Sequence, residues 1–278
     1  MLRTRLATAA VAIPLLVWVI VWNPWSLFAW LVAAASLVAV SEYCAMAFPG
    51  DLGHRLFGFA AGALLLCSML APSEDRFAMA LAGVVVGGLV LMLAREPDLR
   101  RGVVALGLAL VGALYAGFLL PHYLWMHRLA DPMLPAGAAG PAGGWRWVVL
   151  TLVIAMAGDV GGYFGGRYLG RHKLMPSVSP GKTLEGSVAA SAANLAGGIF
   201  CKLTFLQGLG WGEVVVLSLL AGCLAQVGDL SESMLKRAFG AKDSGWIIPG
   251  HGGVLDRIDS LVFPAPFVYY YARFFFDH

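Results

Sequence analysis

The chain is dominated by apolar runs long enough to cross a lipid bilayer, and this feature restricts its fold more than any other. A helix needs about 17 to 25 mostly apolar residues to cross the hydrocarbon core. Such runs lie at 6–22, 26–48, 55–71, 75–94, 102–126, 146–168, 185–206, 212–236 and 258–275. The sequence therefore predicts an all-α integral membrane protein, a polytopic helix bundle of about nine transmembrane helices. Because only Asn23, Pro24 and Trp25 separate the first two runs, these could instead form one re-entrant hairpin.

The composition agrees with a membrane environment. Hydrophobic residues make up 59% of the 278 residues and charged residues 13%, whereas a soluble domain is about a quarter charged. The net charge of +3 does not indicate nucleic-acid binding, because the Lys and Arg residues lie in short loops between apolar runs. Glycine is abundant at 35 residues, and small residues let membrane helices approach closely.

The distribution of the basic residues predicts the orientation. With the N-terminus in the cytoplasm, 14 of the 19 Lys and Arg residues fall on the cytoplasmic side. The other five are Arg76, Arg128, Arg146, Lys202 and Arg273. Cytoplasmic loops of membrane proteins carry an excess of basic residues, so we expect a cytoplasmic N-terminus.

Polar residues divide the chain into two regions. Residues 1–145 form N-terminal transmembrane helices with few ionisable groups inside the spans, Glu42 being an exception. Residues 146–278 form a C-terminal transmembrane region that is rich in such groups and is expected to be catalytic. The segment 130–144 between them is rich in Pro, Gly and Ala and is assigned no function.

The first polar cluster lies at the cytoplasmic end of the eighth apolar run. Asp229, Glu232, Ser233 and Lys236 are separated by helical spacings of three and four residues, so they share one face. A helix end that emerges into water would explain Lys236 and Arg237, which can snorkel. It explains Asp229 less well, since a carboxylate inside a span is costly and by default indicates function.

The second cluster contains Lys242, Asp243 and the run from Pro249 to Ser260, with His251 between glycines. Asp256 and Asp259 are three residues apart and can present both carboxylates on one helical face, a ligand pair that suits Mg²⁺ bound with substrate phosphates. An N-cap at Asp256 is the simpler explanation, but it accounts for one carboxylate only. His251 could contact an anion, act as a general acid, or have no role.

The third cluster joins the sixth and seventh runs. Asp159 lies among apolar residues and needs a cationic or metal partner. Gly181-Lys182-Thr183 is similar to the end of a P-loop, but Pro176 stands where the first glycine of that motif belongs. The Gly161/Gly165 and Gly162/Gly166 pairs have the small-xxx-small spacing of packed membrane helices.

Two segments carry a family resemblance. The run SMLKRAFGAKDSGWIIPGHGGVLDRID, from Ser233 to Asp259, resembles the signature of the phosphatidate cytidylyltransferases, also called CDP-diacylglycerol synthases. The pattern GRxxGRHKLxPxxSPGKTxEG, from Gly166 to Gly186, is similar to another characteristic segment of that family. The resemblance covers about residues 150–265 well, and the first half matches only as a set of apolar spans.

The resemblance implies transfer of a cytidylyl group from CTP to phosphatidate in the bilayer, with Mg²⁺ required. The distribution of basic residues places the site at the cytoplasmic side of what is expected to be a bacterial inner membrane. The resemblance also allows a homodimer. The residues expected to hold Mg²⁺, or a second cation with it, are Asp159, Asp229, Glu232, Asp256 and Asp259. The residues expected to be catalytic are Asp229, Lys236, Asp256, Arg257 and Asp259. The residues expected to bind substrate are Ser179, Lys182, Thr183, Arg237, Lys242, His251, Gly252 and Gly253.

Other classes fit less well. A secondary transporter would also have many spans and intramembrane carboxylates, but it predicts charges near mid-membrane and two similar halves, and the sequence shows no repeat. A structural protein gives no reason for metal-like acid spacing. An intramembrane protease lacks the expected Gly-x-Ser-x-Gly or paired aspartate motifs.

Overall fold

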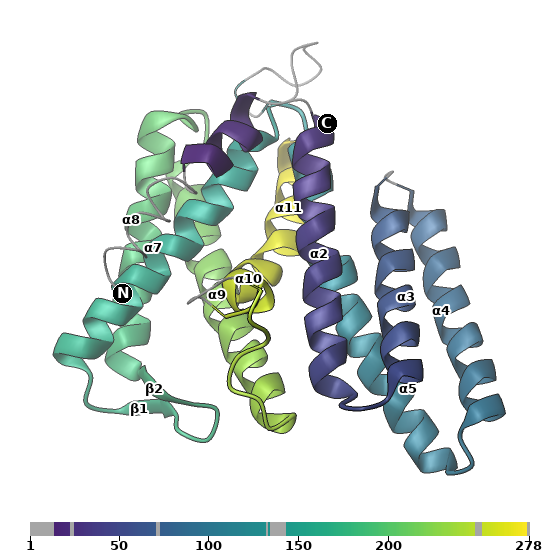
Figure 1. Cartoon of the computed structure of the whole chain (residues 1–278). Coiled ribbons are helices and arrows are strands. Elements are labelled where there is room, and N and C mark those ends of the chain that lie inside the picture. Colours follow the sequence, from purple (N-terminus) through teal and green to yellow (C-terminus); the bar gives the residue numbers. More distant parts are fainter. Residues whose placement is uncertain are drawn as a thin grey trace.

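The computed structural model describes residues 14–22, 25–70, 73–131, 133, 143–247 and 252–276. In this part of the chain the structure is a bundle of helices with one short hairpin (Figure 1). Six helical segments are long and apolar enough to cross a membrane. This confirms an all-α membrane architecture.

The first half of the bundle is formed by α2 (Trp25–Ala47), α3 (Leu52–Met69), α4 (Glu74–Arg95) and α5 (Leu99–Leu114). The π-helix η1 (Tyr115–Leu119) and the short helix α6 (His122–His127) continue the course of α5, so that one segment from Leu99 to His127 is long enough to span. Asp51, Ser73 and Asp98 cap α3, α4 and α5 by accepting backbone N–H bonds, which satisfies groups that lack a partner within the helix. These caps fix where each helix begins.

The second half contains α7 (Trp145–Leu169), α8 (Leu184–Thr204), α9 (Trp211–Ala238), α10 (Leu255–Val262) and α11 (Pro264–Phe276). The predicted packing of the glycine-rich face of α7 is confirmed, because α7 lies along α8 and a Cβ on Gly161 would lie 2.9 Å from the Ala189 carbonyl oxygen. A Cβ on Gly162 would meet Ala190 of α8 at 3.4 Å. Close helix contact therefore depends on the absence of side chains here.

Three of the nine expected spans are not among the six described segments that are long and apolar enough to cross a membrane. Run 6–22 lies partly outside the described residues, and 14–22 is helical. Run 185–206 forms α8, a helix of 21 residues that carries several polar side chains and is not among the six. The expectation of a single helix over 258–275 is wrong, since α10 ends at Val262 and Pro264 begins α11. Proline has no N–H for a helix interior but suits a first turn.

A small antiparallel hairpin was not expected from the sequence. Strand β1 (Lys173–Met175) pairs with β2 (Ser179–Thr183), with Lys173 opposite Thr183. The hairpin connects α7 to α8 at the lower end of the bundle in Figure 1. Thr183 ends β2 and caps α8, since its Oγ1 accepts the Gly186 N–H at 3.1 Å. This arrangement places Ser179, Lys182 and Thr183 beside α7 and α9.

Helix α10 lies at about half the height of the bundle, between α9 and α2 (Figure 1). Its close approach to α9 depends on Gly228, where a Cβ would lie 2.5 Å from the Asp259 carbonyl oxygen. On the other side the Tyr123 hydroxyl of α6 donates to the Leu261 carbonyl at 3.1 Å. The fold thus brings the carboxylates of α10 to the level of Asp229 rather than to a loop in water.

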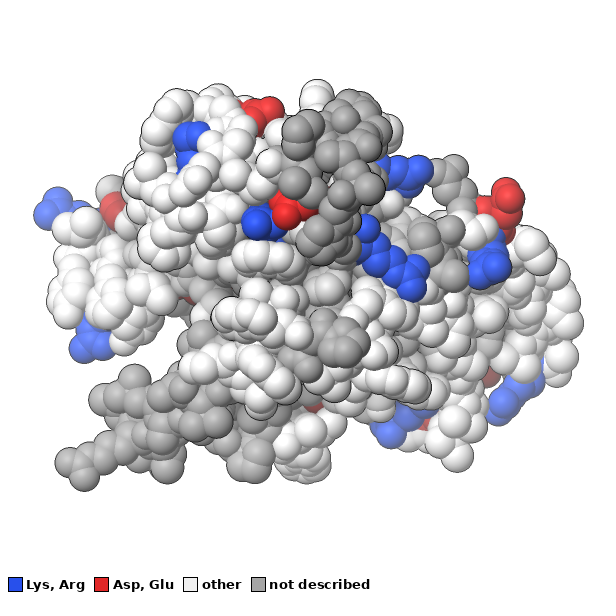
Figure 2. All heavy atoms as spheres, turned by 90° about the horizontal axis from the view of Figure 1, so that it is seen from above, with Lys and Arg blue, Asp and Glu red and all other residues white. Residues whose placement is uncertain are grey.

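The described residues at the end of the bundle seen from above include charged side chains of both signs (Figure 2). Figure 2 shows its Lys and Arg side chains scattered among uncharged residues or beside acidic ones. Among the described residues, Arg146 there pairs with Asp131 and donates to the Phe205 carbonyl at 3.1 Å.

Candidate active site

A pocket of about 760 Å³ lies between α7, the hairpin, α8, α9 and α10. Ligand pockets in proteins commonly have volumes of about 300 to 1,000 Å³. Its charged lining residues are Asp159, Arg167, Lys182, Asp229, Asp256, Arg257 and Asp259. Four carboxylates and three cationic side chains therefore share one pocket within a largely apolar bundle.

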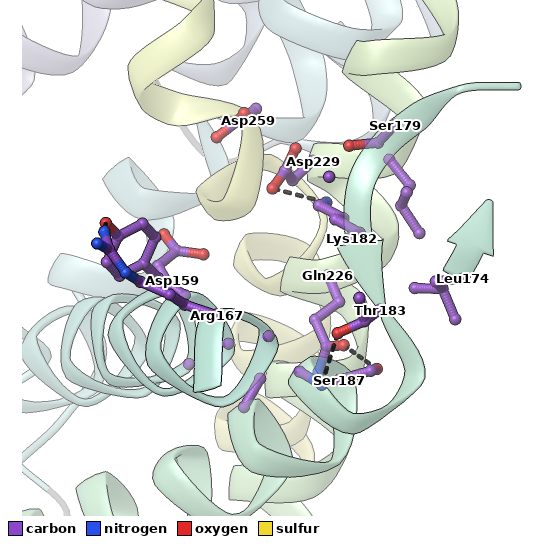
Figure 3. Close-up of a pocket in the computed structure, with 18 of the residues that line it drawn as sticks. Asp159, Arg167, Leu174, Ser179, Lys182, Thr183, Ser187, Gln226, Asp229 and Asp259 are labelled. Carbon is purple, nitrogen blue, oxygen red and sulfur yellow. Dashed lines mark hydrogen bonds and ion pairs between the residues drawn. The ribbon is translucent and has the colours of Figure 1, made fainter. Parts of the chain in front are cut away.

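Lys182 and Asp229 form an ion pair across the pocket. The Lys182 Nζ lies 2.7 Å from Asp229 Oδ2, and both side chains are a little under one third exposed. Figure 3 shows this pair between the hairpin and α9. Asp229 thus has a cationic partner, as a carboxylate inside a membrane helix is expected to have.

Asp256 has three donors and a nearby hydroxyl. Lys236 Nζ donates to Oδ1 at 2.5 Å. The Ser244 and Gly253 N–H groups each donate to Oδ2 at 2.9 Å, and the Ser244 hydroxyl lies at the same distance. These contacts hold the Asp256 carboxylate in place and stabilise its anionic form.

The backbone conformation of the loop before α10 brings the Ser244 and Gly253 N–H groups to Asp256. Gly252 has a φ of +80°, in the left-handed region that glycine adopts without steric cost. A Cβ on Gly252 would also lie 2.6 Å from Asp256 Oδ2. Any other residue at this position would displace the Asp256 carboxylate.

Two further carboxylates face the pocket without an ion-pair partner among the described residues. Asp159 Oδ2 accepts the Ser260 hydroxyl at 3.2 Å, and Asp259 Oδ1 accepts the Ser260 N–H at 2.6 Å. Carboxylates without a direct ion-pair partner suit a bound metal ion. Within the described ranges, however, no three of the pocket's acidic groups have ligand atoms within 4.8 Å of one another. The residues fit a cation held by one or two carboxylates together with substrate oxygens, rather than an all-protein cage.

The predicted site residues divide into two groups. Asp159, Ser179, Lys182, Thr183, Asp229, Asp256, Arg257 and Asp259 line the pocket. Glu232, Lys236, Arg237, Lys242, Gly252 and Gly253 do not. Arg237 and Lys242 are exposed, and Arg237 donates to the Ala241 carbonyl at 3.1 Å. His251 lies outside the described residues.

Glu232 and Lys236 lie behind the pocket. The Glu232 side chain is 1% exposed, and its Oε2 lies 2.6 Å from Lys236 Nζ. Lys236 thereby joins Glu232 to Asp256. In this arrangement Glu232 is the counter-ion of Lys236, and Lys236 fixes the Asp256 carboxylate.

Sequence reasoning missed several pocket residues. Arg167 is one of the 14 basic residues used above only to predict orientation, yet it lines the pocket and donates to the Tyr163 hydroxyl at 2.8 Å. Ser187 and Gln226 also line it and are hydrogen-bonded to each other (Figure 3). The helical spacing of Asp159, Tyr163 and Arg167, four residues apart, could have indicated one polar face on α7.

The fold and the pocket together define an integral membrane protein with a charged site of ligand size. The sequence matches the model of the Cytidylyltransferase family over residues 3–275, which include every pocket residue. The chain belongs to this family and is a membrane-embedded nucleotidyltransferase.

Curated relatives extend the match over nearly the whole chain. The phosphatidate cytidylyltransferase of Brucella suis biovar 1 (strain 1330) is 36% identical over 275 residues, covering 99% of this chain and 94% of that protein. The Synechocystis protein of that name is 36% identical over 226 residues, covering 75% and 74%. The Bacillus subtilis (strain 168) protein of that name is 30% identical over 220 residues, covering 77% and 78%.

Proposed function

We propose that this protein transfers the cytidylyl group of CTP to phosphatidate, giving CDP-diacylglycerol and pyrophosphate. The observation that carries the proposal is the pocket itself, in which four carboxylates and three cationic side chains meet among membrane helices. A triphosphate and a lipid phosphate both need cations to gather them, and the lipid tails need an apolar surrounding. The relatives named for this activity support the same reaction.

The chemistry requires positioning and charge neutralisation. A phosphate oxygen of phosphatidate attacks the α-phosphorus of CTP, the bond from that phosphorus to the bridging oxygen breaks, and pyrophosphate leaves. The attacking phosphate monoester is already an anion at neutral pH, so no strong general base is needed. Most of the rate enhancement then comes from orientation and preorganised charge.

The cationic side chains are the proposed phosphate ligands. Arg257 and Arg167 line the pocket, and neither is ion-paired with a carboxylate among the described residues. Arginine can bind phosphate oxygens in a bidentate manner. Lys182 is already paired with Asp229 and adds a point charge on the hairpin side. These three groups surround the pocket from α7, β2 and α10.

The carboxylates are the proposed metal ligands. Mg²⁺ at this site would neutralise phosphate charge and bridge the reacting groups when bound. Asp229, Asp259 and Asp159 offer oxygens toward the pocket, and Asp256 keeps capacity on Oδ1, which has one donor. Glu232, being buried against Lys236, is better suited to support Asp256 than to bind the ion.

The proposed orientation places the N-terminus and the pocket on the cytoplasmic side of a bacterial inner membrane. In Figure 1 the hairpin, the α2–α3 loop, the α4–α5 loop and the C-terminal end of α9 all lie at the lower end. Eleven of the 19 Lys and Arg residues lie in these segments or within six residues of them. The positive-inside tendency supports a cytoplasmic lower end, where CTP is available.

A product assay tests the function. The purified full-length protein is incubated in mixed micelles with phosphatidate, Mg²⁺ and CTP labelled in the cytidine, and lipid-extractable label and pyrophosphate are both measured. We expect equal amounts of the two products and no activity in excess chelator until Mg²⁺ is restored. A transporter would form neither product, and the absence of both from active-site-intact protein would exclude the proposal.

A further inference from the structure

A buried carboxylate of the N-terminal half reaches the loop that carries the active-site helix. Glu42 is the single charged residue of α2, and only 5% of it is exposed. It does not line the pocket. The contacts of this carboxylate are made with residues more than 200 positions away in the chain. A charge buried at such a place needs several donors to offset its desolvation.

Those donors come from the start of α10. The Val254 N–H donates to Glu42 Oε1 at 3.0 Å, and the Leu255 N–H donates to Oε2 at 2.8 Å. The first N–H groups of a helix have no partner within it, and α10 has no side-chain cap of its own. Glu42 therefore caps α10 from a different helix, with a negative charge at the end of the helix dipole where it is favourable.

The same carboxylate is coupled to Asp256 through Ser244. The Ser244 hydroxyl lies 3.0 Å from Glu42 Oε2 and 2.9 Å from Asp256 Oδ2, while its N–H donates to Asp256. A Cβ on Gly245 would lie 2.7 Å from Glu42 Oε1, and a Cβ on Gly253 would meet both Glu42 oxygens. The loop is thus wrapped tightly around Glu42 on the side away from the pocket.

We propose that Glu42 is a positioning residue for the reaction, holding α10 and Ser244 so that Asp256, Arg257 and Asp259 face the pocket. The N-terminal helices then complete the active site rather than only anchoring it. This inference rests on the proposed cytidylyl transfer. Its physical core, the capping of α10 by Glu42, can be tested without activity.

The experiment compares three variants of the full-length protein in detergent micelles. Glu42→Gln keeps the size of the side chain but turns one acceptor into a donor facing N–H groups. Ser244→Ala removes only the bridging hydroxyl. Ser36→Ala is the matched control, because its buried hydroxyl lies on the same helix and donates to the Ala116 carbonyl, away from α10. The readouts are kcat, the Mg²⁺ concentration for half-maximal rate, the melting temperature, and amide exchange of peptides covering Val254 and Leu255.

We expect Glu42→Gln to lower kcat by about 10- to 100-fold, the range set by losing one charge-assisted hydrogen bond, and to raise the Mg²⁺ requirement. Amide exchange at Val254 and Leu255 should accelerate. Ser244→Ala should change kcat, the Mg²⁺ requirement and amide exchange in the same direction but by less. Ser36→Ala should lower the melting temperature alone. Glu42→Gln protein that matches the control in kcat, Mg²⁺ dependence and exchange overturns the inference.

Two further results keep the test decisive. If Glu42→Gln does not fold, unchanged kcat and unchanged exchange in Ser244→Ala overturn the inference. If the wild type forms no lipid product, the proposed function fails, and the exchange data alone then decide whether Glu42 caps α10.

Discussion

Lys236 offers the sharpest test of how the site is built. Its ammonium lies 2.6 Å from Glu232 and 2.5 Å from Asp256, and the three side chains are 12%, 1% and 7% exposed. Lys236→Met removes the charge with little change in volume and leaves two carboxylates without their shared partner. Removing one member of a buried ion pair costs about 3 to 5 kcal/mol.

The expected loss is large enough to measure. A change of 1 kcal/mol shifts the melting temperature of a chain of this size by about 2 to 4 °C, so the lower end of the range corresponds to roughly 6 to 12 °C. The assay is thermal unfolding in detergent, followed by the fluorescence of the nine tryptophans. Lys173→Met, at an exposed position of β1, is the control and should leave the melting temperature unchanged.

A second variant separates stability from catalysis. The double variant Lys236→Met/Glu232→Gln no longer has the buried charge of Glu232. It should therefore recover at least half of the decrease in melting temperature that Lys236→Met causes. Cytidylyl transfer should stay low, because Asp256 Oδ1 has still lost its donor. Two results would refute this explanation of the site. One is a melting temperature of Lys236→Met equal to that of the Lys173→Met control, and the other is a double variant that melts no higher than Lys236→Met.

Three other predictions follow from single contacts. Lys182→Met removes the partner of Asp229 at 2.7 Å and should lower kcat/KM for CTP by about 10- to 100-fold; steady-state kinetics with unchanged values would contradict this. Gly228→Ala places a Cβ 2.5 Å from the Asp259 carbonyl, so α9 and α10 should separate, with a stability loss of about 1 to 3 kcal/mol and lower kcat; an unchanged melting temperature and rate would count against the described approach. Asp51 accepts the His54 N–H at 3.1 Å, and hydrogen bonds from the His54 backbone and side chain lower the pKa of Asp51. The ionised Asp51 carboxylate therefore stabilises the folded protein above the unfolded pKa of about 3.9, and this contribution is lost as the pH falls through the lower folded pKa. Asp51→Asn keeps the cap, and its deficit in melting temperature at neutral pH should shrink below about pH 4; a deficit independent of pH would disprove the charge contribution.

The helical stripe on α9 shows what periodicity can and cannot give. The spacing of Asp229, Glu232 and Lys236 correctly predicted one polar face, since the helix has a fixed repeat. It could not show that Asp229 enters the pocket whereas Glu232 turns behind it. That division depends on α10, which packs against α9 and supplies Asp256 as the second partner of Lys236.

The hairpin and the break before α11 were not predicted from the sequence, for different reasons. Strands of three and five residues are too short to establish a two-residue alternation. The run 258–275 is apolar enough to suggest one span, and Pro264 within it was the signal that a helix ends there. Glu42 was visible as a carboxylate in an apolar run, but its partners lie at the other end of the chain, so only the tertiary structure could identify them.

The most direct test of the account is the cytidylyl-transfer rate of Asp229→Asn and Asp256→Asn, measured on folded protein with labelled CTP and phosphatidate. Asp98→Asn is the control, because this exposed N-cap of α5 lies outside the pocket and asparagine caps equally well. We predict wild-type activity for the control and a loss of at least about 100-fold for each pocket variant. Full activity in both pocket variants would contradict the assignment of this pocket as the active site.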